Sequence, residues 1–139
     1  MTAIQKGGEM ARIMIIDDDI ELAVNTAALI GKAGHETSML HTTVDAVRKV
    51  VENKPDLLIL DVMFPDNPVA GFDLARQIRR TKAVKDLPII LLTGINQDFP
   101  MDFSSHDIDP VWMPVQDFME KPVKIPVLLE KIDRLIQKH

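Results

Sequence analysis

Carboxylate side chains follow two short apolar segments of this sequence. Asp17, Asp18 and Asp19 come directly after the apolar run 12–16, and Asp61 comes directly after the apolar run 57–60. Carboxylates that lie close together repel and raise one another's pKa unless a cation compensates. Oxygen ligands of this kind suit Mg²⁺, which takes one or two carboxylates together with waters and phosphate oxygens. If the fold brings these residues together, we expect a magnesium site.

A hydroxyl and an ammonium group follow two further segments in the same way. Thr93 comes after the apolar run 89–92, and Lys121 follows the weaker segment 117–120. Phosphoryl transfer needs a nucleophilic carboxylate, a divalent cation and donors for the phosphoryl oxygens. These residue types are therefore consistent with phosphoryl transfer to a carboxylate, provided that the four segment ends meet.

The elements that must position these residues alternate between strands and helices. Short continuous apolar runs are typical of parallel strands that are buried on both faces. The expected strands are Arg12–Ile16, Glu36–Leu40, Leu57–Leu60, Ile89–Leu92 and Asp117–Glu120. The expected helices run from Ile20 to Ala33 with Gly34 as the stop, from a cap at Thr43, from about Phe72 to Arg80, and from about Pro126 to Gln137.

This alternation predicts an α/β fold, in which a five-stranded parallel sheet carries helices on both faces. In such sheets the ligand site lies beyond the carboxyl ends of the strands. The candidate residues all follow strands, so we expect them at one edge of the sheet.

Composition limits the remaining possibilities. The chain has 139 residues, a net charge of −5 and no cysteine, which predicts one domain and excludes a disulfide framework or a thiolate nucleophile. The acidic balance argues against nucleic acid as a primary partner. No apolar run reaches the roughly 18 residues of a membrane span, and the polar start lacks the apolar region of a signal peptide. We expect a cytoplasmic domain over residues 11–139, preceded by a flexible extension over residues 1–10.

Each candidate residue also has a purely structural interpretation. The run Asp17–Asp19 could cap the following helix, because carboxylates favour a helix N-terminus. Asp61 could be a turn former, Thr93 a strand-end residue, Lys121 a solvated surface lysine and Phe118 a core side chain. The histidines have no partner four residues away, so a zinc motif is not expected; His35 and His41 are predicted to lie in loops that flank a strand.

At these residues the sequence resembles the receiver domains of two-component response regulators. The motifs are IMIIDDD, LLILDVMFP, IILLTG and FMEKP, in the expected order, and the match runs from about Arg12 to Gln137. The resemblance implies a flavodoxin-like, doubly wound sheet with strand order 2-1-3-4-5.

The resemblance also implies a role for each of the acidic residues. Asp61 matches the phosphoacceptor, which takes a phosphoryl group from a sensor histidine kinase or a histidine phosphotransfer protein. Asp18 matches the direct Mg²⁺ ligand, Asp17 a ligand that acts largely through water, and the backbone carbonyl of Met63 completes the set with Asp61.

On the same basis Thr93, which precedes Gly94, and Lys121 match the hydroxyl and ammonium groups that bind the phosphoryl oxygens. Phe118 matches an aromatic residue that reorients on activation. The peptide bond before Pro122 is expected to be cis.

The sequence departs from the family pattern in two places. The glycine expected after the phosphoacceptor is Gly71, two residues later than usual, which leaves the insert Asp66–Ala70 beside the site. Thr93 and Lys121 are 28 residues apart, several more than usual, and the segment between them contains Pro100, Pro110 and Pro114. Because proline disrupts helices, the fourth helix of the family is expected to be short or irregular.

Two apolar positions bear on the lifetime of a phosphorylated state. Met63 lies two residues after Asp61, and Ile95 lies two residues after Thr93. In the family, polar residues at these positions can position the water that hydrolyses the acyl phosphate, so slow self-dephosphorylation is predicted.

We therefore interpret the chain as a stand-alone, Mg²⁺-dependent receiver that catalyses only its own phosphorylation and slow dephosphorylation. The final helix ends the chain, so output is expected through a protein target, and homodimer formation is left open. Alternatives are a degenerate receiver acting as an interaction module and a metal-dependent phosphohydrolase, although a haloacid dehalogenase would need a carboxylate at Met63. A flavodoxin-like flavin protein is disfavoured because Asp17–Asp19 would repel the flavin phosphate.

Overall fold

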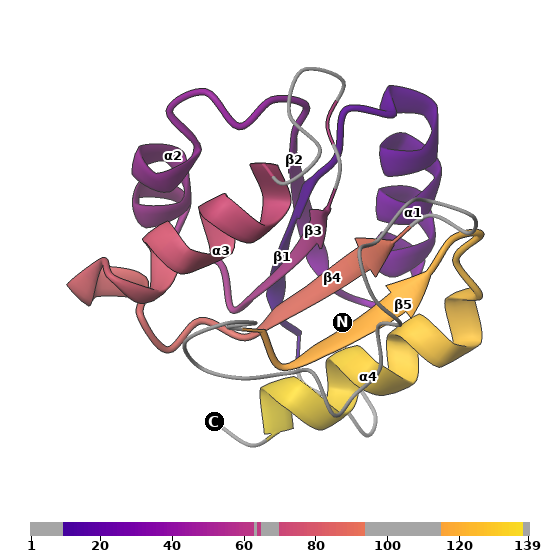
Figure 1. Cartoon of the computed structure of the whole chain (residues 1–139). Coiled ribbons are helices and arrows are strands. Elements are labelled where there is room, and N and C mark those ends of the chain that lie inside the picture. The colour runs from indigo at the N-terminus through magenta and orange to yellow at the C-terminus, as the bar shows by residue number, and fades with distance from the viewer. Residues whose placement is uncertain (1–9, 63, 65–69, 94–114, 138–139) are drawn as a thin grey trace.

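Five parallel strands form one sheet in the order β2-β1-β3-β4-β5 (Figure 1). The computed structural model describes residues 10–62, 64, 70–93 and 115–137. The strands are β1 (Arg12–Ile16), β2 (Glu36–Leu40), β3 (Leu57–Asp61), β4 (Ile89–Thr93) and β5 (Asp117–Glu120). The predicted strands and the predicted strand order are therefore confirmed, with β3 and β4 each one residue longer than expected.

The three central strands are buried on both faces. In β3, Leu58 and Leu60 belong to one core cluster, whereas Leu57 and Ile59 belong to a second cluster on the other side of the sheet. Side chains alternate between the faces of a strand, so every position of β3 must be apolar up to its last residue. This two-sided burial explains the continuous apolar runs of the sequence.

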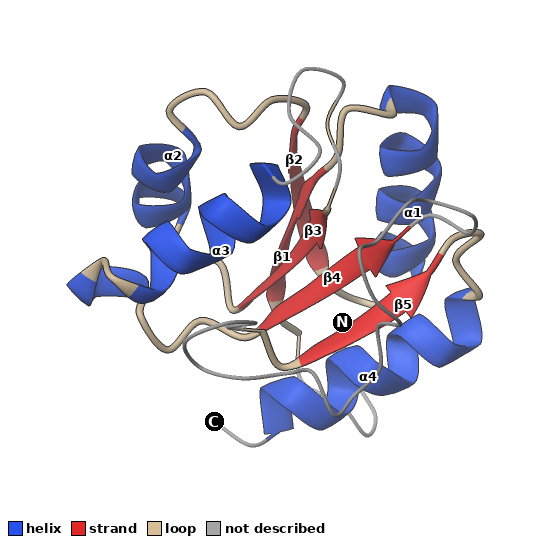
Figure 2. Ribbon diagram, viewed as in Figure 1, coloured by secondary structure: helices blue, strands red, loops and turns tan. Residues whose placement is uncertain are grey.

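Helices cover both faces, as predicted (Figure 2). The helices α1 (Ile20–Lys32) and α4 (Ile125–Gln137) contribute to the core cluster on one face, and α2 (Ala46–Asn53) and α3 (Ala70–Arg79) contribute to the cluster on the other. Their buried positions follow helical spacing, as in Leu128, Ile132 and Leu135 of α4. The predicted inward face of α4 therefore packs against the sheet. In α1 the predicted inward face is wrong in part, because Leu29 and Ala33 are exposed and Ala23, Thr26, Ala27 and Ile30 are buried instead.

The starts of two helices differ from the sequence prediction, and one short helix was not predicted. α2 begins after Asp45, whose φ of 58° places it in the left-handed region, so the predicted cap at Thr43 is wrong. The hydroxyl of Thr42 instead accepts a hydrogen bond from the Val44 N–H at 3.1 Å, a local turn that competes with the first helical turn. α3 begins at Ala70, earlier than expected, and a short 3₁₀ helix, η1 (Lys82–Val84), precedes β4.

α1 ends as predicted. Ala33 is its C-cap, and Gly34 follows with a φ of 103°, a conformation that only glycine adopts without strain.

Two predictions lie outside the described residues. These are the short or irregular fourth helix in the segment 94–114 and the form of most of the insert 66–70. In the part of the chain that the structure describes, no helix is both long enough and apolar enough to cross a membrane.

Candidate functional site

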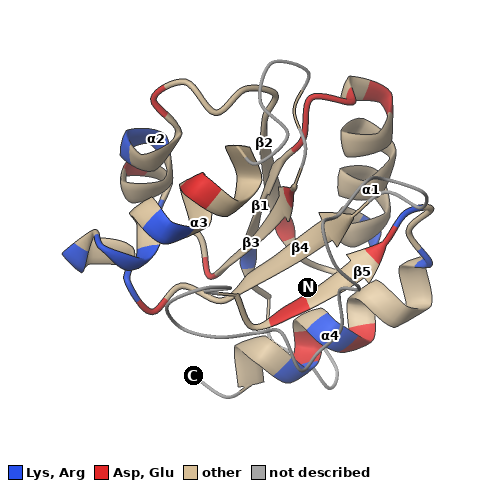
Figure 3. Ribbon diagram, viewed as in Figure 1, with Lys and Arg blue, Asp and Glu red and all other residues tan. Residues whose placement is uncertain are grey.

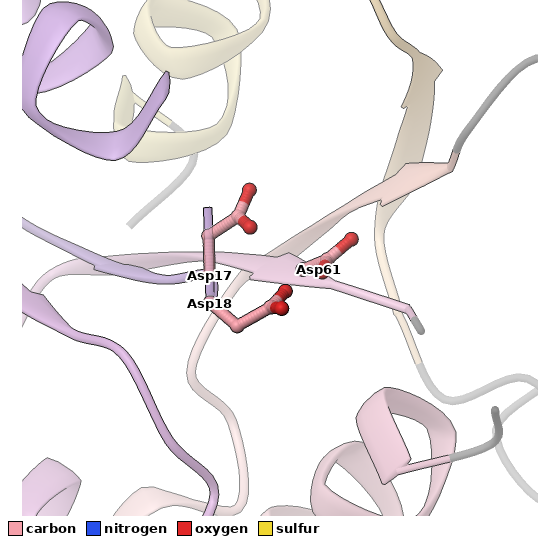
Figure 4. A group of neighbouring side chains, drawn as sticks. All are labelled: Asp17, Asp18 and Asp61. Atoms are coloured by element: carbon pink, nitrogen blue, oxygen red, sulfur yellow. The ribbon is translucent and has the colours of Figure 1, made fainter. Parts of the chain in front are cut away.

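The carboxyl ends of β1 and β3 bring the first two carboxylates side by side. These strands pair in parallel up to Ile16 and Leu60, so the next residues, Asp17 and Asp61, are neighbours across the sheet edge. Their residues are only 1% and 3% exposed. Oxygen atoms of Asp17, Asp18 and Asp61 all lie within 4.8 Å of one another, and Figure 4 shows the three side chains around a common space. The sequence prediction that these residues meet is confirmed.

The connection between β1 and α1 is held by short-range hydrogen bonds. Oδ1 of Asp17 accepts the backbone N–H of Asp19 at 2.9 Å. Oδ1 of Asp19 in turn accepts the N–H of Leu22 at 3.1 Å and caps α1. The capping interpretation of the acidic run is therefore correct for Asp19, whereas Asp17 and Asp18 lie in the cluster with Asp61.

Lys121 supplies a positive charge to the two most buried carboxylates. It follows β5, and its Nζ lies 3.2 Å from Oδ2 of Asp17 and 3.2 Å from Oδ1 of Asp61. Burial lowers the pKa of the Lys121 ammonium, but the charges of Asp17 and Asp61 outweigh this effect and raise it overall. Lys121 is therefore charged at neutral pH as a member of the site, and it is not a solvated surface lysine. The Lys121–Pro122 peptide bond is cis.

Asp61 is held in an unfavourable environment for its negative charge. Burial and the neighbouring charge of Asp17 raise its pKa from 3.8 to about 7, although Lys121 opposes this shift. Asp18 adds a smaller effect in the same direction as Asp17. A bound cation at the cluster would reverse this balance, because positive charge favours the ionised form of a carboxyl group.

Thr93 belongs to β4, and Phe118 belongs to the neighbouring edge strand β5. Thr93 ends β4, is buried, and its Oγ1 donates to the carbonyl of Met119 at 3.4 Å. The parallel register places Leu92 beside Asp61, so Thr93 lies one residue beyond this pair at the same sheet edge. Phe118 is half-buried and packs against the core cluster that includes residues of α2 and α3.

Gly71 brings the start of α3 into backbone contact with the end of β3. Its N–H donates to the carbonyl of Val62 at 2.9 Å. A Cβ atom at this position would lie 2.7 Å from Cα and 2.8 Å from the carbonyl oxygen of Val62, and it would also meet the carbonyl oxygen of Asp61. Only glycine fits so close to the backbone, which accounts for glycine here despite the two additional residues before it.

The donor set fits a hard divalent cation. Oδ2 of Asp17 is buried, and its described partner is the Lys121 ammonium at 3.2 Å, in an ion pair that lacks hydrogen-bond geometry. A cation or water at the cluster would complete the coordination of this oxygen. Among the described residues, three carboxylates and the ammonium of Lys121 leave net negative charge at the site. Acidic residues mark the connection between β1 and α1 in Figure 3, whereas basic residues gather toward the end of α3 and η1. The acidic triad is consistent with a metal site.

Two of the predicted site positions, Met63 and Gly94, lie outside the described residues. Conversely, sequence reasoning assigned no role to His41, which lies directly beside the cluster. Its Nδ1 is 3.1 Å from the carbonyl oxygen of Asp17. The register of β1 and β2 could have predicted this contact. The two strands pair up to Ile16 and Leu40, so the residues that follow them, Asp17 and His41, are neighbours.

The family model for the response regulator receiver domain matches residues 13–133. One curated relative is the DNA-binding dual master transcriptional regulator RpaA of Synechocystis sp., which is 31% identical over 94% of this chain and 54% of that protein. Another is Protein PilH of Pseudomonas aeruginosa, which is 28% identical over 91% of this chain and 98% of that protein.

A solved structure with the same fold is a CheY-like response regulator receiver domain protein from Methanospirillum hungatei. It has a TM-score of 0.75 and 22% sequence identity, covering 94% of this chain and 96% of that chain. The chain spans about half the length of RpaA and of the regulator AfsQ1 of Streptomyces coelicolor.

Proposed function

This chain belongs to the response regulator receiver domain family of two-component signalling, and we propose that Asp61 is its phosphoacceptor. The observation that carries the proposal is the meeting of Asp61 with two further carboxylates within 4.8 Å and with the Lys121 ammonium at 3.2 Å. A nucleophile, a cation site and a donor for phosphoryl oxygens are the parts that transfer to a carboxylate requires.

In the proposed reaction an oxygen of Asp61 attacks the phosphorus of a phosphohistidine donor. The new bond joins this oxygen to phosphorus, the phosphorus–nitrogen bond breaks, and the histidine nitrogen keeps the electron pair. Lys121 and the hydroxyl of Thr93 then donate to the phosphoryl oxygens, where negative charge is greatest. The Thr93 hydroxyl is available for this step because its bond to the Met119 carbonyl is long, at 3.4 Å.

Mg²⁺, held by Asp17, Asp18 and Asp61 with the carbonyl of Met63, would neutralise charge on the phosphoryl oxygens when bound. Asp61 must be ionised to attack, and its raised pKa of about 7 leaves it partly protonated near neutral pH. The acidic cluster and the nucleophile are therefore linked: occupancy of the cluster by a cation favours the reactive form of Asp61.

Signalling in this proposal is a population shift between two conformations, which a protein target distinguishes by binding one better than the other. The donor is a sensor histidine kinase or a histidine phosphotransfer protein, and the reaction takes place in the cytoplasm. Phe118 is the candidate for a side chain that reorients, because it is only half-buried beside β4. The apolar residues Met63 and Ile95 predict slow loss of the phosphoryl group.

The experiment is incubation with acetyl phosphate and Mg²⁺ followed by intact-mass measurement. The proposal predicts a gain of one phosphoryl group in the wild type and in the control variant Asp86→Asn. Asp86 is a matched control because its carboxylate is exposed and lies between η1 and β4, away from the site. Asp61→Asn should show no gain. An adduct that persists in Asp61→Asn would contradict the assignment of the acceptor.

The same measurement separates the alternatives. Steady release of phosphate without any adduct would favour a metal-dependent phosphohydrolase. If the protein forms no adduct and releases no phosphate, the result would favour a degenerate receiver that binds partners without phosphorylation.

A further inference from the structure

His41 contacts the acidic cluster from outside it. It is the first residue after β2, and its Nδ1 lies 3.1 Å from the backbone carbonyl oxygen of Asp17. A carbonyl oxygen only accepts hydrogen bonds, so the ring nitrogen must donate and Nδ1 carries the hydrogen. The N–H of Asp17 donates to the carbonyl of Leu40 at 3.0 Å. Both sides of Asp17 are thus tied to the end of β2, one by the backbone and one by the imidazole.

The carbonyl that His41 holds belongs to the peptide that links Asp17 to Asp18. Strand pairing with β2 and β3 ends at Ile16, so the strand register no longer fixes this peptide. The Asp17 carboxylate has its own restraints, namely the N–H of Asp19 at 2.9 Å and the ammonium of Lys121 at 3.2 Å. Within the described chain, no hydrogen bond or ion pair reaches the carboxylate of Asp18. The direction of the Asp18 side chain therefore depends on the orientation of its backbone.

We infer that His41 is a positioning residue for the metal site: by holding the Asp17 carbonyl it fixes the peptide from which the Asp18 carboxylate extends. The inference rests on the proposed function, since it assigns His41 to the Mg²⁺ site of that function. A ligand that is oriented before the cation binds loses less conformational freedom on binding. Groups that orient metal ligands typically change metal affinity by about 10- to 100-fold when they are removed. Because His41 acts through the backbone, we expect a smaller effect, about 5-fold.

Asparagine offers a conservative replacement at this position. Its Nδ2 is separated from the backbone by the same number of bonds as Nδ1 of histidine, and it can donate one hydrogen bond to the same carbonyl. Leucine fills a similar volume without any donor, and alanine removes both. Val44→Ala is the matched control, because Val44 lies three residues later in the same connection and is 68% exposed.

The test is titration of the 139-residue chain with MgCl₂ by isothermal calorimetry, with thermal unfolding measured for each variant. We expect His41→Ala and His41→Leu to bind Mg²⁺ about 5-fold more weakly than the wild type, and His41→Asn and Val44→Ala to bind it within 2-fold. The rate of phosphorylation by acetyl phosphate should fall in His41→Leu at low Mg²⁺ and recover at saturating Mg²⁺. A residue with a merely structural role would lower the unfolding temperature without this dependence on Mg²⁺.

Unchanged Mg²⁺ affinity in both His41→Ala and His41→Leu, with normal binding by the wild type, would overturn the inference and leave the proposed function intact. Equal weakening in His41→Asn and His41→Leu would also overturn it, because the donor would then be irrelevant. Absence of Mg²⁺ binding by the wild type would overturn both proposals.

Discussion

Nζ of Lys121 lies 3.2 Å from Oδ1 of Asp61, the carboxylate that we propose as the phosphoacceptor. The two residues come from non-adjacent strands, because Asp61 ends β3, Lys121 follows β5, and β4 lies between them. The backbone N–H of Lys121 donates to the carbonyl of Thr93 at the end of β4. This hydrogen bond positions Lys121 beside the end of β4, from where its side chain reaches Asp61. This ion pair makes the ionisation of Asp61 depend on Lys121.

The first prediction concerns Lys121→Met. Removing the ammonium leaves Asp17 and Asp61 facing each other without compensation, and breaking a buried ion pair by deleting one partner typically costs about 3–5 kcal/mol. Because Lys121 is partly exposed, with 22% of its side chain accessible, we expect about 2 kcal/mol at pH 8 without divalent metal. Urea unfolding measures this loss, and phosphorylation by acetyl phosphate should slow at least about 10-fold, the size of effect typical for loss of one preorganised donor. Lys124→Met, at an exposed lysine of the same connection, should change neither quantity.

The second prediction concerns pH. The folded-state pKa of Asp61 is about 7, above the ordinary value of about 4 for the unfolded chain, so the folded state binds more protons between these values. The contribution of Asp61 to stability is therefore fully present below pH 4 and is lost as the pH rises through 7. Without divalent metal, we expect Asp61→Asn to gain roughly 2 kcal/mol relative to the wild type between pH 5 and pH 8. Urea unfolding at both pH values checks this.

The comparison in the second prediction needs a control for pH effects elsewhere. Asp86→Asn is suitable because Asp86 is exposed and lies at the opposite edge of the sheet, before β4. A stability difference between wild type and Asp61→Asn that stays constant from pH 5 to pH 8 would contradict the raised pKa of Asp61. Addition of Mg²⁺ should reduce the difference, because a cation at the cluster stabilises the ionised carboxylate.

The fold was predictable because burial on both faces leaves a simple pattern. The first four residues of β3 each pack into one core cluster or the other, so the run Leu57–Leu60 identifies a central strand without further information. Parallel pairing then places the residues after each strand at one edge, which is why Asp17 and Asp61 were predictable neighbours. Local pattern and sheet geometry together determined this part of the site.

The remaining features depend on contacts that no local pattern contains. Thr43 has the residue type of a helix cap, but the backbone of Asp45 adopts a φ of 58° and α2 starts two residues later. His41 has no motif, and its contact with Asp17 follows only from the register of β1 and β2. His35 lies in a loop, as predicted, but its side chain is 5% exposed and bridges separate elements. Tertiary contacts decide such positions.

The third prediction concerns His35→Ala. Nδ1 of His35 accepts the backbone N–H of Ala11 at 3.1 Å, and Nε2 lies 4.0 Å from Oδ1 of Asp133 in α4. Removing the ring leaves the N–H of the buried Ala11 without its acceptor, and an unsatisfied buried donor costs about 1–3 kcal/mol. We expect a loss of about 2 kcal/mol in urea unfolding. Asp133→Asn should cost less than about 0.5 kcal/mol, because this partner is half-exposed and distant. Equal losses of stability in His35→Ala and Asp133→Asn would mean that the contact with Asp133, and not the hydrogen bond from Ala11, is the stabilising contact of His35.

The fourth prediction compares two glycines. A methyl group at Gly71 would lie 2.7 Å from Cα of Val62 and 2.8 Å from its carbonyl oxygen, whereas a methyl group at Gly31 in α1 meets no atom within 4 Å. Because backbone atoms cannot move aside as a side chain can, Gly71→Ala should lower the free energy of unfolding by about 1–3 kcal/mol. It should also slow phosphorylation of the adjacent Asp61 by displacing the end of β3.

Gly31→Ala is the opposite case. Alanine has the higher helix propensity, so this change in α1 should raise the free energy of unfolding by about 0.5–1 kcal/mol and leave phosphorylation unchanged. Urea unfolding and the rate of adduct formation, measured on both variants, check the pair. If Gly71→Ala were as stable and as readily phosphorylated as Gly31→Ala, the start of α3 would not hold the end of β3 in place, and the two additional residues before Gly71 would have loosened this contact.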